Sequence, residues 1–246
     1  YISPIMSNPE NVFQLGPNAY GKPATALNIL RETIMGPELF DFAFKTYSQR
    51  WMFKHPSPED FFRTMEDASA VDLDWFWRGW FYSTDVVDIG VKEVKRYYVS
   101  PKPSKEVNEL LARYGMTVDD LNPSVFMVAE DSEEFDASLA EGKPADHSEI
   151  LASALKEGQE LPSYFYEIEF EKPGGIVMPI IVEYSYADGT SERITYPVQV
   201  WRKNDASVKK LITSNKELIG VTIDPDAETA DVDLTNNAWP KKEADS

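Results

Sequence analysis

Residues 16–25, GPNAYGKPAT, contain the residue types of a phosphate-binding loop. Gly16 is followed by four residues and then by Gly21 and Lys22, which is the Walker A spacing. Such a loop needs Ser or Thr directly after the lysine, because that hydroxyl ligates magnesium, and it needs backbone N–H groups that face the phosphates. Pro23 stands at that position and supplies neither group. A nucleotide-binding loop is therefore disfavoured.

Tyr20 is the other residue of this stretch that could do chemistry. One interpretation is structural: a tyrosine in a turn packs its ring on neighbouring helices, as buried tyrosines commonly do. The functional interpretation is that the phenol is held at the mouth of a cleft as a neutral hydrogen-bond donor, aimed where an oxyanion would form. The position of Tyr20 in the sequence does not separate these two interpretations.

Motifs for metal binding are weak. The two histidines, His55 and His147, lie far apart and no His-Glu-x-x-His sequence is present, whereas a catalytic zinc site needs about three protein ligands. We therefore expect no metal ligand in this chain, and His55 is interpreted as a loop residue. The acidic run from Asp224 to Glu228 resembles a calcium loop but lacks the glycine and the last glutamate of an EF-hand, so a solvated turn is expected.

The composition is that of a globular protein with one large or two small domains in 246 residues. A formal charge of −18 disfavours nucleic acid and anionic membrane surfaces as partners, because polyanions bind patches of Lys and Arg. No apolar run is long enough to span a bilayer, so no membrane insertion is expected. The absence of cysteine removes disulfides and thiolate chemistry. The sequence begins at Tyr1 without methionine, which we interpret as a fragment or a processed product.

Residues 22–83 have the apolar spacing of α-helices with very short connections. The first helix is predicted to begin at Pro23 and to end at Gly36, and the next begins at Pro37. Their apolar stripes are Leu27, Leu30 and Ile34, and then Phe40, Phe44, Tyr47 and Trp51. This part of the chain is expected to be a compact helical subdomain.

Two more helices are predicted in the same subdomain. Ser57, followed by proline and two acidic residues, is typical of a helix N-terminus. The side chains that this helix should bury are Phe61, Met65 and Ala68. Asp72 is predicted to cap a last short helix, LDWFWRGWFY, whose aromatic side chains require burial.

Residues 91–162 carry a weaker signal. The segment KEVNELLARYG predicts a helix, whereas AEDSEEFDASLAEGKPADHSE is acidic, poor in apolar residues and without a clear period. We interpret residues 91–162 as an acidic insertion or linker, partly helical or mobile.

From residue 163 to residue 240 the apolar period is two, which predicts strands. The expected inward faces are Tyr164, Tyr166, Ile168 and Phe170, and then Ile180, Val182, Tyr184 and Tyr186. Asp188-Gly189 predicts a hairpin turn before a strand with Ile194 and Tyr196 on one face. Five or six strands joined by hairpins imply a small antiparallel sandwich, so the predicted fold class is α+β. Residues 241–246 are expected to be a disordered tail.

The elements of residues 19–85 occur in a specific order. They are Tyr20-Gly21-Lys22, Gly36, Tyr47, Ser57 with Asp60-Phe61, Asp72-Leu73 and Trp80. This order resembles the segment that follows the metal motif in M1-family zinc aminopeptidases, the gluzincins. The departure is Pro23, where that family has Gly; a proline in the first turn of a helix would leave Tyr20 in register. The segments GGIVMPIIVEYSYADGTSERITY and VTIDPDAETADVDLTNNAWP resemble, more loosely, the β-sandwich that follows the catalytic domain in that family.

The resemblance implies three parts. Residues 1–90 would be the helical C-terminal part of a thermolysin-like catalytic domain, and residues 163–240 an Ig-like antiparallel β-sandwich. The acidic stretch between them lies outside the resemblance. A periplasmic or cell-envelope location is expected from the kind of relative that this chain resembles.

The resemblance also implies a catalytic role for Tyr20. In the family, a zinc-activated water attacks the peptide carbonyl, and the matching tyrosine hydroxyl stabilises the tetrahedral oxyanion together with zinc. The family's zinc ligands, general base and substrate-binding residues match nothing here, and they are expected upstream of Tyr1. The chain would then be the C-terminal portion of a zinc aminopeptidase, inactive alone, with the upstream catalytic half of the same polypeptide and a peptide substrate as partners.

Two alternatives come from other classes of protein. The first is a non-catalytic binding or structural module that keeps the scaffold after losing its metal site. An intact upstream His-Glu-x-x-His would discriminate between it and the enzyme. The second is a nucleotide-binding protein, which would have to bind ATP with magnesium despite Pro23.

Overall fold

The computed structural model describes residues 2–8, 10, 12–100, 102–121, 126–141 and 162–241. Its helices are α1 (Lys22–Ile29), α2 (Pro37–Trp51), α3 (Pro58–Ser69), α4 (Asp74–Tyr82), α5 (Lys105–Arg113) and α6 (Ser138–Glu141). Its strands are β1 (Gly90–Ser100), β2 (Phe126–Ala129), β3 (Tyr164–Glu171), β4 (Ile180–Tyr186), β5 (Ser191–Tyr196), β6 (Ser207–Ser214), β7 (Leu218–Ile223) and β8 (Ala238–Trp239). The fold class is α+β, which confirms the prediction at this level.

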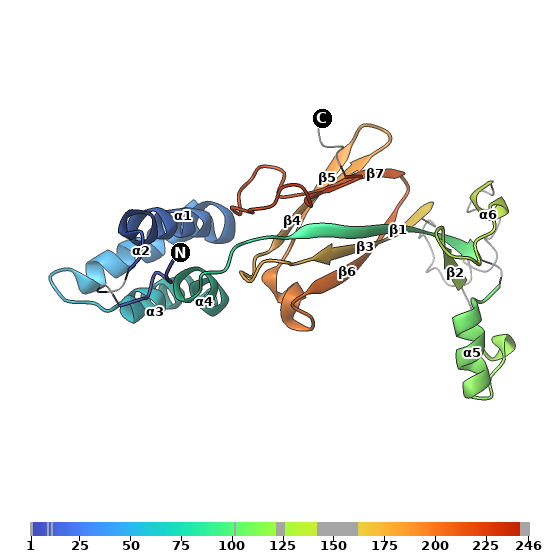
Figure 1. Cartoon of the computed structure of the whole chain (residues 1–246), viewed down its shortest axis with the longest axis horizontal. Helices are drawn as coiled ribbons and strands as arrows, with labels where there is room; N and C mark the ends of the chain where they lie inside the picture. The colour runs from blue at the N-terminus through green and yellow to red at the C-terminus, as the bar shows by residue number, and fades with distance from the viewer. Residues whose placement is uncertain are drawn as a thin grey trace.

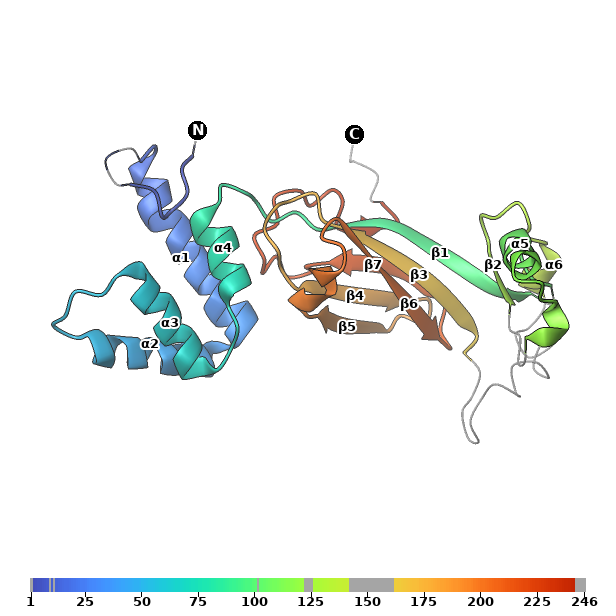
Figure 2. The same cartoon turned by 90° about the horizontal axis from the view of Figure 1, so that it is seen from below.

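The elements are arranged along an elongated molecule (Figure 1). Helices α1 to α4 gather at one end, the two sheets form the middle, and α5, α6 and β2 lie at the other end. Figure 2 shows α1 beside α4 and α2 beside α3. The sheets therefore adjoin the helical end at its inner side.

The first helix begins earlier than the sequence predicts. Helical backbone continues without a break through residues 15–35, so Pro23 lies inside the helix and not at its start. Gly21, directly before α1, has helical dihedral angles (φ −62°, ψ −59°). The turn Pro17–Gly21 is a wider, π-helical turn. A proline inside a helix cannot donate to the carbonyl one turn earlier and its ring crowds that carbonyl, and the wider turn accommodates both effects.

Two predicted helix boundaries are confirmed. Gly36 has a φ of +82°, a conformation that favours glycine, and it ends the first helix directly before α2. Ser57 caps α3, because its hydroxyl accepts the Asp60 N–H at 3.3 Å and the Asp60 carboxylate accepts the Ser57 N–H at 2.8 Å. Local backbone and capping preferences therefore fix where α2 and α3 begin.

The start of α4 differs slightly from the prediction. Its N-cap residue is Leu73, not Asp72. The Asp72 carboxylate accepts the Asp74 N–H at 3.3 Å, and Glu66 of α3 accepts the Leu73 N–H at 2.8 Å. The helix start is held jointly by a local and a tertiary hydrogen bond, and only the local one is visible in the sequence.

Aromatic side chains of α3 and α4 form the core of the helical end. The predicted burial of LDWFWRGWFY is confirmed for Leu73, Phe76, Trp77, Trp80 and Phe81, whereas Trp75 is only partly buried and Tyr82 is exposed. Phe62 of α3 stacks on Trp77 with ring centroids 4.6 Å apart. In α3, Met65 is fully buried as predicted, but Phe62 is more deeply buried than the predicted Phe61. The face of α3 that carries Phe62 and Met65 points inward because α3 packs against both α2 and α4.

Each sheet has four antiparallel strands. The strand orders are β2-β1-β3-β6 and β5-β4-β7-β8. Asp188-Gly189 forms the predicted hairpin turn between β4 and β5. The expectation that hairpins join the strands in general is wrong, because β3 to β4, β5 to β6 and β6 to β7 each cross from one sheet to the other.

The two sheets pack face to face through one apolar core. The predicted inward faces of β3 and β4 are buried, with Tyr164 only partly so. Across the core, the Leu218 N–H of one sheet donates to the Tyr166 hydroxyl of the other at 3.0 Å. Aromatic rings also meet there, since Phe170 and Tyr196 have centroids 6.2 Å apart.

Residues 91–100 belong to a sheet and not to a linker. They form most of β1, which pairs with β3 and, at its far end, with β2. The prediction failed because a bulge between Val91 and Glu93 shifts the pairing register there and interrupts the two-residue period. Partial exposure along the rest of the strand further weakens the apolar alternation.

Beyond β1 lies the outer end of the molecule. The predicted helix α5 is confirmed, and its N-cap Ser104 accepts the Val107 N–H at 3.3 Å. The described part of the acidic stretch contains turns and the short α6. Residues 142–161, which include His147, and the tail 242–246 lie outside the described residues.

Candidate functional site

Tyr20 lies on the π-helical turn that precedes α1. Its side chain is 75% exposed, so its ring does not pack on the helical subdomain as the structural interpretation supposed. It is also not upstream of the helix, because the helical backbone begins before it. The phenol is instead presented to solvent from a regular element.

The wide turn Pro17–Gly21 involves the next two residues, Lys22 and Pro23. The Lys22 N–H donates to the Pro17 carbonyl, five residues earlier, and Pro23 has no N–H to donate. Single π turns inside α-helices are rare and frequently lie at functional sites. A second π-helical segment, Leu30–Met35, ends the same helix, so this geometry is not confined to the stretch around Tyr20.

Two side chains of the stretch turn inward and hold it in place. Asn18 is only 4% exposed, and its amide donates to the Pro4 carbonyl at 3.4 Å. The half-buried Lys22 donates from Nζ to the Ser83 carbonyl at 3.0 Å. Burial lowers the pKa of Lys22, and the nearby Asp85 carboxylate partly opposes that shift. Tyr20 thus lies between two anchored residues, which suits a side chain that must keep its direction.

Chemically, this arrangement offers one hydroxyl donor on an anchored backbone. Such a donor can stabilise an oxyanion, but it supplies neither a nucleophile nor a base. Within the described residues, no group of three or more His, Cys, Asp or Glu side chains could hold a metal ion. His55 is exposed in the loop between α2 and α3, as predicted, and a zinc site does not fit the residues described.

A second feature of the helical end is a groove between α3 and α4 with a volume of about 450 Å³. Its polar lining is Glu59, Arg63, Glu66, Asp74, Arg78 and Tyr82. These residues were not predicted from the sequence, although their spacing of three or four places each set on one helix face. Burial raises the pKa of Glu66, and the Leu73 N–H that it accepts partly opposes that shift. The groove has groups for binding, and we assign it no catalytic role.

In the acidic loop after β7, Asp226 is exposed as expected for a solvated turn, but Asp224 is not. Asp224 is only 5% exposed, and its carboxylate accepts the N–H groups of Glu228 at 2.7 Å and Thr229 at 2.9 Å. It also accepts the Thr229 hydroxyl at 2.5 Å. All of these donors come from its own loop, so Asp224 closes the loop.

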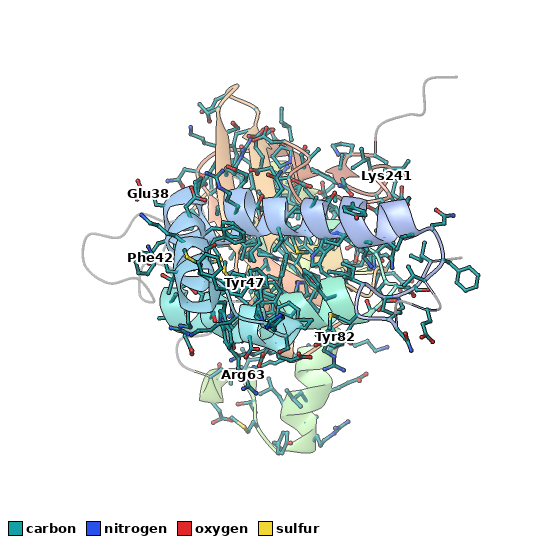
Figure 3. All side chains as sticks on the ribbon, turned by 90° about the vertical axis from the view of Figure 1, so that its left-hand side faces the viewer. Glu38, Phe42, Tyr47, Arg63, Tyr82 and Lys241 are labelled. Atoms are coloured by element: carbon teal, nitrogen blue, oxygen red, sulfur yellow. The ribbon has the colours of Figure 1, made fainter. Side chains whose placement is uncertain are left out.

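The outer face of the helical end exposes large apolar side chains. Figure 3 views this face and shows Phe42, Tyr47, Arg63 and Tyr82 on it. Phe42 is 59% exposed on α2, and Phe53, in the loop that follows α2, is 98% exposed. Exposed apolar side chains of this size occur at contacts with other chains or domains. Among the described helices, none combines the length and apolar character needed to cross a membrane.

No protein-family model matches the sequence, and no curated protein matches it. The crystal structure of Legionella pneumophila aminopeptidase A in complex with aspartic acid is similar over 84% of this chain, with 11% sequence identity and a TM-score of 0.43. The similar part is 16% of that protein's chain. Similarity at this level assigns neither a family nor an activity to the present chain.

Proposed function

We propose that this chain is part of an M1-like zinc aminopeptidase and that Tyr20 donates a hydrogen bond to the oxyanion of the tetrahedral intermediate. The observation that carries the proposal is the exposed Tyr20 phenol on a π turn whose neighbours are anchored. It coincides with the residues 19–85 whose order resembles that family. A hydroxyl fixed before substrate arrives needs little reorganisation when the oxyanion forms, which is the basis of this type of catalysis.

The proposal assigns a role to each part of the fold. Helices α1 to α4 would be the C-terminal part of a thermolysin-like catalytic domain, and the two sheets an Ig-like sandwich beside it. The helical end next to paired four-stranded sheets supports this division.

Zinc would be held by another part of the same polypeptide, the upstream catalytic half. The described residues of this chain contain no group that could hold a metal ion, so we assign no ligand here. The exposed apolar side chains of the helical end, such as Phe42, support a large partner surface of this kind. As an isolated chain, the protein is expected to have no peptidase activity.

The alternative is a non-catalytic binding module. The observation that favours it is the nearly complete exposure of Phe53, since a binding surface needs apolar anchors but no oxyanion donor. In that case the polypeptide would bind a partner through its helical end, and Tyr20 would be dispensable.

The test uses the full-length polypeptide of the source organism, purified with its native metal. Its hydrolysis of aminoacyl anilides is measured for the wild type, Tyr20→Phe and Tyr114→Phe. Loss of one oxyanion donor should lower kcat by about two orders of magnitude. Tyr114 is the matched control, because it is 70% exposed and directly follows α5, which lies at the opposite end of the molecule.

The outcomes separate the two candidate functions. Chelator-sensitive hydrolysis that falls in Tyr20→Phe and stays unchanged in Tyr114→Phe supports the proposal. Normal turnover in Tyr20→Phe would refute the role of Tyr20. A native polypeptide of 27.9 kDa without activity would support the binding module, because the chain would then act without metal ligands.

A further inference from the structure

We infer that Lys22 is a positioning residue for Tyr20: it ties the π turn to the C-terminal end of α4, which in turn is fixed by a loop of the β-sandwich. The catalytic consequence rests on the proposed function of Tyr20. The tie itself rests only on contacts within this chain, so the two can be tested separately.

The first link joins α1 to the C-terminal end of α4. Lys22 Nζ donates to the carbonyl of Ser83, the residue that follows the last turn of α4, at 3.0 Å. The last carbonyls of a helix have no partner within the helix and carry partial negative charge, so a half-buried ammonium group is a favourable partner for them. Lys22 therefore acts as a tertiary cap of α4, although it is 61 residues away in the sequence.

Ser83 is itself held firmly. Its hydroxyl donates to the Gly79 carbonyl at 2.7 Å and accepts the Asp85 N–H at 3.2 Å. The Asp85 carboxylate also attracts the Lys22 ammonium. The chain at residues 83–85 thus has a defined conformation to which Lys22 is attached, and a flexible terminus would not provide that.

The second link joins this point to the β-sandwich. A Cβ atom on Gly175 would lie 2.3 Å from Asp85 Cγ, so the loop before β4 packs directly against the residues that follow α4. In the same place the Ile176 N–H donates to the Val86 carbonyl at 3.1 Å. A shift of the sandwich loop would therefore displace residues 83–86.

The two links act on Tyr20 through continuous helical backbone. Lys22 follows Tyr20 by two residues, and no break lies between them. A displacement of Ser83 would be transmitted to the direction of the Tyr20 phenol. Misplacing a catalytic donor by about 1 Å can cost about a hundredfold in rate, so the effect is large enough to measure.

The experiment compares Lys22→Met, which has no donor, with Lys22→Arg, which keeps one. Lys45→Met, an exposed lysine of α2, is the control for loss of a charge. The first readout is amide hydrogen exchange at residues 18–22 in this chain. Losing a charged hydrogen bond should raise exchange there by about tenfold in Lys22→Met, with most of the protection restored in Lys22→Arg.

The second readout is turnover by the full-length polypeptide. Lys22→Met should lower kcat by about tenfold with KM unchanged, because the donor acts on the transition state and not on substrate binding. Gly175→Ala is a second variant that leaves α1 untouched. It should change exchange at residues 18–22 in the same direction.

Each outcome is decisive. Unchanged exchange in both Lys22→Met and Gly175→Ala would overturn the tie, whatever the turnover. Raised exchange with normal kcat would overturn the positioning role. Raised exchange in a polypeptide that has no peptidase activity would support the tie and refute the proposed function. Raised exchange with reduced kcat, rescued by Lys22→Arg, would support both.

Discussion

The indole N–H of Trp51, at the end of α2, donates to the Thr64 hydroxyl of α3 at 3.1 Å. Thr64 passes a hydrogen bond on to the Asp60 carbonyl at 2.6 Å. Thr64 is only 1% exposed, so water cannot replace either bond. The two helices are therefore joined by a polar relay inside an otherwise aromatic contact.

Thr64→Val should lower the free energy of unfolding by about 1–3 kcal/mol, because valine fills the same space but leaves the Trp51 indole without an acceptor. Urea unfolding measures the change. The matched control is Thr46→Val on α2, since Thr46 makes the same type of bond within its helix, to the Phe42 carbonyl at 2.9 Å, without a tertiary donor. Equal effects of the two substitutions would contradict the relay.

Gly174→Ala should be strongly destabilising. A Cβ there would lie 2.4 Å from the Val86 carbonyl oxygen, which is backbone and cannot rotate away, so a cost of about 1–3 kcal/mol is expected. Gly21→Ala is the control, because nothing lies within 4 Å of its Cβ and its dihedral angles are helical. That substitution should stabilise the protein by about 0.5–1 kcal/mol. A thermal scan in which both variants unfold at the wild-type temperature would contradict the close approach.

The hairpin turn of β4 and β5 should make stability depend on pH. The Lys216 ammonium and the Thr190 hydroxyl and N–H lower the pKa of Asp188 to about 2. The pKa of Asp188 is lower in the folded protein than in the unfolded chain. The stabilisation that the ionised carboxylate provides is therefore fully present above about pH 4, and it is lost as the pH falls toward 2. Asp188→Asn, which keeps a turn-forming side chain but no charge, should therefore be less stable than the wild type at pH 6.

The check is the difference in urea midpoint between the wild type and Asp188→Asn across this pH range. The difference should shrink toward pH 2, where the wild-type carboxylate becomes protonated. Lys216→Met should lower the urea midpoint near neutral pH in the same way as Asp188→Asn. A difference that stays constant with pH would argue against an ionic origin.

Phe53 combines full exposure with a left-handed backbone, φ +59°. A residue with a Cβ is disfavoured in this region, so Phe53→Gly should raise the free energy of unfolding by up to about 1 kcal/mol. Phe53→Ala keeps the strain and loses almost no packing, and it should leave stability unchanged. A loss of stability in Phe53→Ala would mean that the ring makes contacts in solution that the structure does not contain.

Much of the local structure was predictable from the residues. Gly36 and Ser57 end and begin helices through their own dihedral preference and capping chemistry, which depend on near neighbours only. The strands β3 and β4 were predictable because one face of each is buried and the period of two is clear. By contrast, β1 was missed because its bulge breaks that period.

The site shows the same division. The residue type and motif spacing singled out Tyr20, and its catalytic role stays a prediction. The position of Pro23 inside a continuous helix, and the π turn that results, became clear only from the backbone. The groove residues Glu59 and Arg63 were overlooked, although their spacing of four was a usable signal.

The sequence by itself determined the helix boundaries at Gly36 and Ser57, the α+β class and the turn at Asp188-Gly189, because each depends on interactions between residues a few positions apart. The tertiary structure alone decided that Lys22 meets Ser83, that strands cross between the sheets, and that Asp224 is buried in its loop. Contacts such as the one between Lys22 and Ser83 join residues that are far apart in the sequence. Burial, as at Asp224, excludes water only when the whole chain packs.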